Sequence, residues 1–404
     1  MVLILTLLLL TCAAARGEDW PQFLGPARNG VYSAADIGAS WPKDGPALVW
    51  KLDVGHGFSG PVVSAGRLIL FHRRENRAIV DCLDVRNGHR IWSTEYSTDY
   101  VDDFGFDDGP RGTPAIAGEK VYTFGAEGVL QCLDFAKGKR QWSVDTRKKF
   151  GSSKGFFGAA CSPLVEDGRV LLNVGGSNGV GVAAFDANTG KNLWTATSDE
   201  AGYAAPVAAT IGGVRHVLFF TRNGLVGIDP ATGKVLFQFP WRSRSHASVN
   251  AAAPVVVGNL VFLSASYGTG ATLVQIDGAS VKQLWASDDA LSNHYATSVY
   301  RDGYLYGYHG RQEYGQSLRS IELKTGKVQW NVDGFGAGTV TLAGDRLLLI
   351  RENGELVVAP ASPKEFKPSA QAQLLPATVR AYPALADGKL YVRNEHTLAC
   401  FNLK

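Results

Sequence analysis

The chain has 404 residues, a formal net charge of +3 and 19% charged residues. These values are typical of a soluble protein surface, and they exclude a strongly basic nucleic-acid-binding protein. Gly is abundant, with 47 residues, and short alternating apolar runs recur throughout, whereas no stretch keeps a helical apolar period over the length of a helix. The composition therefore predicts an all-β protein.

The first eleven residues, MVLILTLLLLT, form an apolar run about half as long as a membrane-spanning helix requires. Three alanines follow at 13–15, a small-residue pattern that suits cleavage before Arg16. We therefore expect residues 1–15 to be a signal peptide, and the mature protein to be periplasmic or secreted, with no membrane span. A lipid anchor at Cys12 is the alternative, because LLTC loosely resembles a lipidation motif.

Residues 16–46 are interpreted as a lead-in segment, and residues 47–404 as one repeat domain. Within the domain, the phrase FDANTGKNLW at 185–194 has related copies at 83–92, 133–142, 228–237 and 321–330. Each copy ends on an aromatic residue, and with a less regular copy that ends at 285 the aromatic spacings are 50, 52, 43, 48 and 45 residues. Four short apolar runs within a period of about 40–50 residues are typical of a propeller blade.

Eight such units can be counted. The seventh begins near Gly338 and lacks the final aromatic residue, and the eighth begins near Arg380 and ends one strand short. The run ALVWKLD at 47–53 supplies the missing strand, so the sequence predicts an all-β, eight-bladed β-propeller of four-stranded antiparallel blades that an N-terminal strand closes. The large rings that we expect to pack across the seams between blades are Trp50, Trp92, Trp142, Trp194, Phe237, Trp285 and Trp330.

The D-x-x-T-G-K-x-x-W phrase and the stretch DWPQFLGPARNGVYS at 19–33 resemble the PQQ-like, or quinoprotein-like, family of eight-bladed propellers. The resemblance covers nearly all of residues 19–404. The family includes the outer-membrane assembly factor BamB and PQQ-dependent alcohol dehydrogenases, so the resemblance implies the fold and leaves the function open.

The connections between strands fall into two classes. Turns such as SAGR, EDGR and the T-G-K turns are tight, and in a four-stranded meander they all lie on one face of the ring. The links between blades are longer: 21 residues separate Trp92 from Pro114. Connections longer than their geometry requires are usually functional or disordered, and the abundance of aromatic residues here argues against disorder. We therefore expect a ligand or partner site on the long-loop face and in the axial funnel.

The candidate binding residues lie on these links, most of them shortly before an innermost strand. They are His56, Phe58, Asp108, Arg111, Lys154, Phe156, Phe157, Arg242, Arg244, His246, Asn250, Asp289, Asn293, His294, Tyr295, Arg380 and Tyr382. For each of them a structural role is the alternative, because single loop ion pairs are commonly exposed and loop aromatics can plug a propeller's central hole. The remaining histidines are interpreted as packing or surface residues: His72, His89, His216, His309 and His396.

Cysteine positions predict buried free thiols and no disulfide. Cys82, Cys132 and Cys400 each occupy the same column of the repeat, where other copies carry small residues, and Cys161 stands alone.

Recognised catalytic motifs are missing from the sequence, including H-E-x-x-H, C-x-x-C and C-x-x-C-H. We therefore interpret the chain as a binding or scaffold protein for an envelope protein or a small ligand, without nucleic acid, without a cofactor, and monomeric. A purely architectural disc is a weaker alternative.

The other alternative is a quinoprotein-like oxidoreductase with PQQ and calcium, although the adjacent cysteine pair typical of the family's dehydrogenases is missing. The residues that would serve it are His246 or His294 as base, Asp108 or Asp289 to orient the base or hold a metal, and Arg111 or Arg380 to bind an anionic group.

Overall fold

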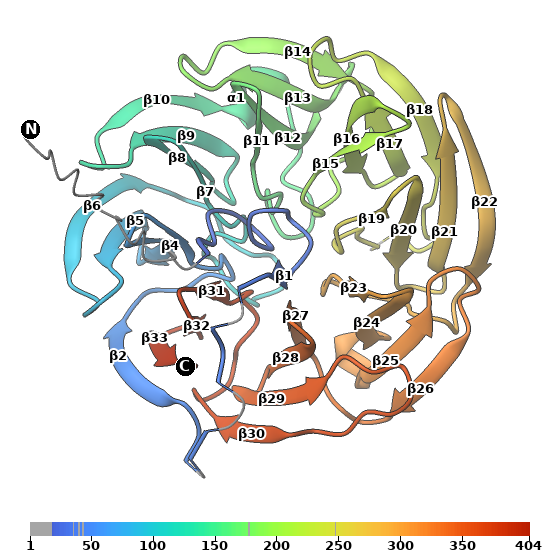
Figure 1. Cartoon of the computed structure of the whole chain (residues 1–404). Coiled ribbons are helices and arrows are strands. Elements are labelled where there is room, and N and C mark those ends of the chain that lie inside the picture. The colour runs from blue at the N-terminus through green and yellow to red at the C-terminus, as the bar shows by residue number, and fades with distance from the viewer. Residues whose placement is uncertain (1–17, 35, 39–40, 43, 177, 247) are drawn as a thin grey trace, which may run out of the picture.

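The computed structural model describes residues 18–34, 36–38, 41–42, 44–176, 178–246 and 248–404. These residues form eight small sheets arranged in a ring (Figure 1). The helices among them are short, α1 (Thr146–Phe150) and the 3-10 turn η1 (Gln312–Tyr314). The chain is thus an eight-bladed β-propeller, which confirms the predicted fold class. The predicted signal peptide and Cys12 lie outside the described residues.

Each blade is an antiparallel meander, and its strands are given from the axis outward. Blade 1 consists of β3 (Val62–Ser64), β4 (Arg67–Arg74), β5 (Arg77–Asp84) and β6 (Arg90–Ser97), and blade 2 consists of β7 (Ala115–Ala117), β8 (Lys120–Phe124), β9 (Val129–Asp134) and β10 (Arg140–Asp145). Blade 3 consists of β11 (Leu164–Glu166), β12 (Arg169–Gly176), β13 (Val180–Asp186) and β14 (Asn192–Ala196), and blade 4 consists of β15 (Val207–Ile211), β16 (Val214–Phe220), β17 (Gly224–Ile228) and β18 (Val235–Pro240). Blade 5 consists of β19 (Val255–Val257), β20 (Leu260–Ala265), β21 (Gly270–Asp277) and β22 (Ser280–Ser287), and blade 6 consists of β23 (Val299–Arg301), β24 (Tyr304–His309), β25 (Ser317–Glu322) and β26 (Val328–Val332). Blade 7 consists of β27 (Gly338–Ala343), β28 (Arg346–Arg351), β29 (Glu355–Pro360) and β30 (Ala370–Gln373), and blade 8 consists of β31 (Ala384–Ala386), β32 (Lys389–Arg393), β33 (Thr397–Asn402) and β2 (Ala47–Asp53).

The ring is closed by its two ends, as predicted. Strand β2 pairs antiparallel with β33, and Trp50 lies opposite Cys400 in the register. The last blade therefore receives its outermost strand from the beginning of the domain, which pairs a sheet edge that would otherwise be open.

The repeated phrase builds the seams between blades. The carboxylate of Asp186 accepts hydrogen bonds from the backbone N–H groups of Asn188 and Thr189, which fixes the turn before Gly190. Gly190 has a φ of 71°, and a Cβ there would lie 2.6 Å from the Trp142 ring of the preceding blade. The Trp142 indole N–H in turn donates to the Ala187 carbonyl oxygen at 3.2 Å. Glycine is thus required here by both its backbone conformation and its neighbour.

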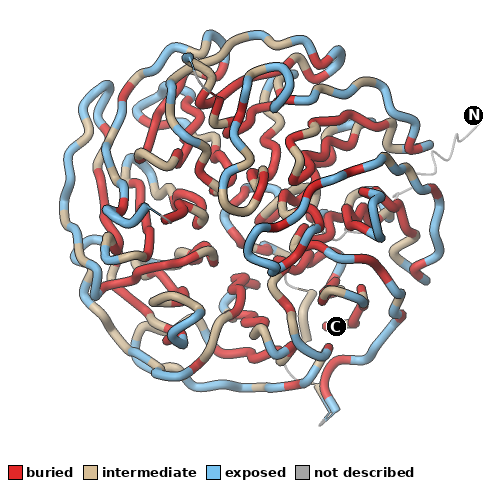
Figure 2. The backbone as a smooth tube through the Cα atoms, turned by 180° about the vertical axis from the view of Figure 1, so that it is seen from behind, coloured by how far each residue is buried: buried red, intermediate tan, exposed pale blue. Residues whose placement is uncertain are grey.

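Apolar burial follows the blades. The middle strands are almost fully buried, and exposed residues gather on the outermost strands and on the connections (Figure 2). The buried free thiols of Cys82, Cys132, Cys161 and Cys400 lie within these cores. Among the described residues there is no helix long and apolar enough to cross a membrane.

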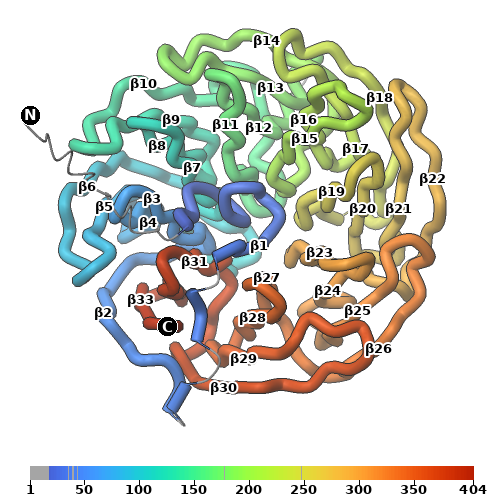
Figure 3. Tube along the Cα trace, viewed as in Figure 1, coloured from blue at the N-terminus to red at the C-terminus, as the bar shows by residue number. Residues whose placement is uncertain are grey.

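The N-terminal segment, defined here as residues 19–32, crosses the axis of the ring on the side of the tight turns (Figures 1 and 3). At its start, the Asp19 carboxylate accepts hydrogen bonds from Ser64 and Ala65 in the tight turn between β3 and β4. At its end, β1 (Val31–Tyr32) adds a parallel strand to β27 of blade 7.

Between these ends the N-terminal segment touches the central edges of several other blades. Leu24 packs in one cluster with Val207, Ala253 and Tyr382, from blades 4, 5 and the approach to blade 8. The buried Arg28 guanidinium donates to the carbonyl oxygens of Ser162 and Pro163 at 3.1 and 2.9 Å, just before blade 3. The middle of the ring is therefore occupied by protein on this side.

Candidate functional site

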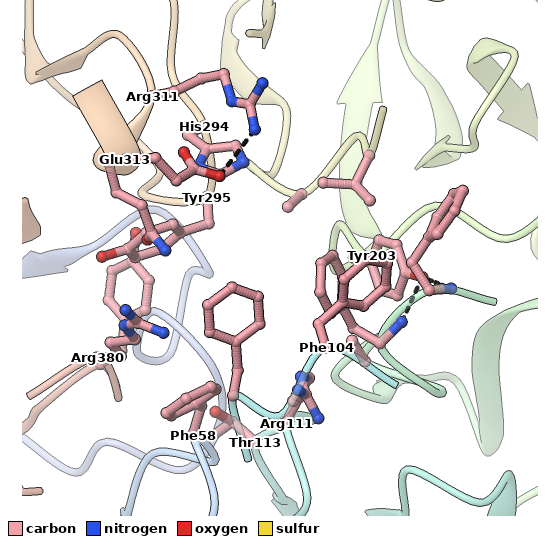
Figure 4. Close-up of a pocket in the computed structure, with 18 of the residues that line it drawn as sticks. Phe58, Phe104, Arg111, Thr113, Tyr203, His294, Tyr295, Arg311, Glu313 and Arg380 are labelled. Atoms are coloured by element: carbon pink, nitrogen blue, oxygen red, sulfur yellow. Dashed lines mark hydrogen bonds and ion pairs between the residues drawn. The ribbon is translucent and has the colours of Figure 1, made fainter. Parts of the chain in front are cut away.

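The long connections enclose a cavity of about 350 Å³ at the other end of the axis (Figure 4). This volume falls in the range of small-molecule sites, about 300–1,000 Å³. We call this cavity the cup. Its lining residues are Phe23, Phe58, Phe104, Phe106, Arg111, Thr113, Phe156, Phe157, Ala160, Tyr203, Val249, Ala251, Tyr267, His294, Tyr295, Arg311, Gln312, Glu313, Arg380 and Tyr382.

Most blades contribute to the cup through segments that lead to an innermost strand. Phe58 precedes β3, Arg111 precedes β7, and Phe157 precedes β11. Tyr267 and Arg311 instead come from connections between second and third strands, in blades 5 and 6. Both kinds of connection lie on the same face of a four-stranded meander, and this brings residues far apart in sequence around one axis.

The N-terminal segment forms part of the floor. The Phe23 ring packs edge-on against Tyr382, with ring centroids 5.0 Å apart. Since Phe23 belongs to the segment that crosses the axis, the cup is blind at its base rather than a passage through the ring.

Aromatic rings form a continuous wall near blades 2 and 3. Phe104 lies 5.1 Å from Phe157 between ring centroids, and Phe106 lies 6.0 Å from the same ring. Phe104 is 52% exposed and Phe106 is 43% exposed, so both rings sit at the rim with an uncovered face. Exposed rings clustered beside a cavity indicate a surface that a bound molecule could cover.

Arg111 lies against this wall. Its guanidinium is 5.7 Å from the Phe157 ring centroid and 5.5 Å from that of Phe58, and it forms an ion pair with the buried Asp102 at 3.2 Å. The Arg111 side chain is only 10% exposed, and its Nη1 has no hydrogen-bond partner among the described residues. A buried unpaired guanidinium N–H is costly, so an acceptor atom that reached Nη1 would stabilise the site.

His294 lies on the link that leads into blade 6, on the opposite side of the ring from Arg111 on the link into blade 2 (Figure 4). Its Nε2 shares a hydrogen bond of 2.8 Å with the Tyr267 hydroxyl, while its Nδ1 has no partner within the described part of the chain. Burial lowers the pKa of His294 to about 4, so the imidazole is neutral at neutral pH. The Glu313 carboxylate is 4.0 Å from Nδ1 and hydrogen-bonds Arg311 at 2.8 Å.

Arg380 is the third arginine that lines the cup, after Arg111 and Arg311. It forms an ion pair with Glu352 at 2.9 Å, and the Tyr295 hydroxyl donates to the same carboxylate oxygen at 2.7 Å. Burial, followed by the nearby Glu352 charge, raises the pKa of Tyr295 well above its ordinary value. Tyr295 therefore stays protonated and holds Glu352 in place beside Arg380.

The structure brings only some of the predicted residues into the cup. These are Phe58, Arg111, Phe156, Phe157, His294, Tyr295, Arg380 and Tyr382. The others predicted lie outside the cup lining: His56, Asp108, Lys154, Arg242, Arg244, His246, Asn250, Asp289 and Asn293.

The buried polar residues of this second group donate hydrogen bonds to backbone carbonyl oxygens. The Asn250 amide donates to the carbonyl oxygens of Thr221 and Trp241, and the Asn293 amide donates to that of Tyr308. Their place before an innermost strand is as predicted, but their side chains turn into the protein because the connections leave carbonyl groups that need donors.

The remaining residues of the group are at the surface or near the rim. Lys154 pairs with Asp103, and Arg242 lies 3.5 Å from Glu200. The His246 ring meets the edge of Phe156 with centroids 5.9 Å apart, so it supports a wall residue from outside. His56, Arg244 and Asp289 are exposed, and the Asp108 carboxylate accepts from the Asp102 backbone N–H.

Several cup residues were not predicted. Phe104 and Phe106 occur in the long link 101–112, where their alternation with charged residues was a usable signal. Tyr267, Arg311 and Glu313 lie between second and third strands, and Phe23 lies in the lead-in segment; nothing in the repeat pattern marks them. A second cavity, of about 360 Å³ and with glycine-rich walls, shares Phe156 and Tyr203 with the cup.

The cup residues do not suit a calcium ion. Calcium takes about six to eight oxygen ligands, mostly carboxylate and carbonyl. Glu313 is the carboxylate among the lining residues, and Arg311 already pairs with it. No group of three or more His, Cys, Asp or Glu side chains among the described residues is placed to hold a metal ion. The donor set is instead that of a site for anions or acceptor oxygens.

Comparison with known proteins gives one family match. Residues 76–332 match the family described as outer membrane protein assembly factor BamB. In sequence, the chain is also similar to the quinohemoprotein alcohol dehydrogenase of Comamonas testosteroni, with 32% identity over 188 residues, which is 45% of this chain and 26% of that protein. The quinohemoprotein alcohol dehydrogenase ADH-IIG of Pseudomonas putida is 35% identical over 156 residues, 37% of this chain and 21% of that enzyme. The matched stretches thus span about a quarter of these relatives or less.

Solved structures show the same fold. BamB from Moraxella catarrhalis aligns with a TM-score of 0.65 and 16% identity, over 88% of this chain and 97% of that one. The Comamonas testosteroni dehydrogenase aligns with a TM-score of 0.71 and 17% identity, over 97% of this chain and 81% of that one. At these identities the likeness concerns the fold alone.

Proposed function

We propose that this chain, which belongs to the PQQ-like propeller family whose model is described as outer membrane protein assembly factor BamB, is an exported binding protein. The cup and the surrounding long-loop face hold its ligand or partner. One observation carries the proposal: a blind cavity with aromatic walls in which buried nitrogen atoms, Arg111 Nη1 and His294 Nδ1, lack hydrogen-bond partners in the described chain. Unpaired buried donors and acceptors cost free energy, and a bound molecule could pair them.

The uneven distribution of features between the two faces supports the same proposal. The tight-turn face carries short turns and the N-terminal segment, whereas the exposed rings of Phe104 and Phe106 and the three guanidinium groups gather on the long-loop face. A purely architectural disc would not require such an asymmetry.

Filling the cup tests this function. Ala160 lines the cup, so Ala160→Trp would occupy it with a large ring, whereas Ala136→Trp adds the same ring to an exposed turn on the opposite face. Both variants and the wild type would be isolated gently from envelope extract, and bound molecules identified by native mass spectrometry. We expect Ala160→Trp to lose the molecules that wild type and Ala136→Trp retain; equal retention by all three would refute the proposal.

A quinoprotein-like oxidoreductase is the second candidate, favoured by the sequence matches to quinohemoprotein alcohol dehydrogenases. The neutral His294 beside Tyr267 could then accept a proton. The described lining of the cup offers the Glu313 carboxylate in place of the six to eight oxygen ligands that calcium takes, and this counts against the function. The test is to add PQQ and calcium to the purified protein and to follow cofactor absorbance and melting temperature; no change at saturating cofactor excludes it.

A further inference from the structure

The charges of the cup are balanced within the protein. Each guanidinium among the lining residues has its own carboxylate: Arg111 pairs with Asp102, Arg311 with Glu313, and Arg380 with Glu352. The cup therefore has little net charge while still offering guanidinium N–H groups. This arrangement suits a ligand with one negative charge better than a polyanion, because three compensated cations attract additional charges only weakly.

The available N–H groups are unequal. Arg380 and Arg311 are 21% and 29% exposed in their side chains, so water can solvate part of each, whereas Arg111 is 10% exposed. Nη1 of Arg111 and Nε of Arg311 are both buried without a hydrogen-bond partner among the described residues. Because Arg111 is the more deeply buried side chain, its Nη1 gains most from a ligand oxygen. Its guanidinium face is already covered by the rings of Phe58 and Phe157, and Asp102 accepts from Nη2, which leaves Nη1 for the ligand.

The aromatic walls of the cup favour a ligand with a flat ring. Beside Arg111 the cup is lined by the rings of Phe104, Phe106 and Phe157. Phe157 meets Phe104 and Phe106 in tilted arrangements at 5.1 and 6.0 Å between centroids, and Phe104 and Phe106 are stacked at 6.5 Å. Aromatic rings favour such offset or edge-to-face contacts, and a further flat ring can join the cluster in the same way. The partly exposed rings of Phe104 and Phe106 would lose their contact with water when it does.

Taking charge, donor and walls together, we infer that the cup binds an aromatic monocarboxylate, with the carboxylate on Arg111 and the ring against Phe104 and Phe157. The inference rests on the proposed function, since it names the ligand class of the same site. The unpartnered Nδ1 of His294, across the ring, offers a second hydrogen bond to a polar substituent at the far end of a longer ligand.

Isothermal titration calorimetry with three probes tests the class on the wild-type protein itself. The probes are 2-naphthoate, its uncharged analogue 2-naphthamide, and the trianion citrate. We expect 2-naphthoate to bind with a one-to-one stoichiometry and 2-naphthamide to bind about tenfold or more weaker, because the amide has no negative charge to pair with the guanidinium and one acceptor oxygen fewer. Absence of 2-naphthoate binding, equal binding of the amide, or tighter binding of citrate would each overturn the inference.

Variants locate the bound molecule. Arg111→Gln should weaken 2-naphthoate binding by about tenfold to a hundredfold, and Arg86→Gln, at an exposed turn on the opposite face, should leave it unchanged. Because Arg111→Gln leaves the buried Asp102 without its cation and could unfold the protein, Phe104→Ala is the second variant. Its ring is half exposed, so it should weaken binding about threefold to tenfold at an unchanged melting temperature. Unchanged affinity in a folded Phe104→Ala protein would contradict the placement.

Failure here can be told from failure of the proposed function. If the naphthoate test fails while Ala160→Trp still loses its native bound molecules, only the ligand class is wrong. If Ala160→Trp retains every molecule, the binding function itself fails.

Discussion

The seam that closes the ring can be weakened selectively by Trp50→Ala. Trp50 is 8% exposed, its indole N–H donates to the Val85 carbonyl oxygen of blade 1 at 3.0 Å, and its ring lies 6.0 Å from that of Tyr391. Truncation of a buried tryptophan costs about 3–5 kcal/mol through lost contacts and the cavity left behind. We expect a loss of this size in the free energy of unfolding.

The location of the effect separates this seam from the others. Trp142 makes the equivalent contact between blades 2 and 3, so Trp142→Ala is the matched control. Hydrogen exchange measured by mass spectrometry should rise in β2 and β33 for Trp50→Ala, and in β10 and its neighbour blade for Trp142→Ala. The closing-strand interpretation is refuted if Trp50→Ala lowers the free energy of unfolding by less than about 1 kcal/mol, or if exchange in β33 does not change.

Three further outcomes are expected. Burial lowers the pKa of His294 from 6.5 to about 4, so the unfolded chain takes up a proton at a higher pH than the folded protein does. The free energy of unfolding should therefore decline as the pH falls from 6.5 toward 4. Measured by urea titration, this decline should be roughly 3 kcal/mol larger in wild type than in His294→Asn. Gly190→Ala, which forces a φ of 71° on alanine against the Trp142 ring, should destabilise by about 1–3 kcal/mol, and an unchanged melting temperature would contradict the seam geometry. If the predicted signal peptide is cleaved, the intact mass of the protein isolated from its native cells should correspond to a chain beginning at Arg16; an intact N-terminus would contradict the predicted cleavage, and a lipidated Cys12 would support the alternative anchor.

The fold was predictable because its signal is periodic. The phrase that ends at Trp92, Trp142, Trp194 and Trp330 recurs at blade spacing. The run that contains Trp50 has the apolar pattern and final aromatic residue of an outermost strand, and this identified it as the closing strand. Turn glycines and seam rings follow local rules of backbone conformation and packing, so one copy explains the others.

The site was predictable only by region. The links before the innermost strands were identified, yet Asn250 and Asn293 turn inward to satisfy backbone carbonyl groups, while Tyr267 and Arg311 reach the cup from connections that the repeat pattern does not mark. Side-chain direction in an irregular connection depends on contacts with distant blades, and no sequence period records those contacts.

The role of the N-terminal segment also required the structure. Its sequence has no copy elsewhere in the chain, and its path across the axis is set by contacts such as Arg28 with the carbonyl groups before blade 3. Phe23 thereby becomes part of the cup, and the axial funnel is blind.

Site-specific photocrosslinking in living cells tests most directly whether the long-loop face is the binding face. A benzophenone amino acid would replace Phe104 at the rim of the cup or Ala136 on the tight-turn face, and the intact mass of the recovered protein would report any adduct. The cup predicts adducts of a defined mass at position 104 and none at 136. Adducts confined to position 136, or equal at the two positions, would contradict it.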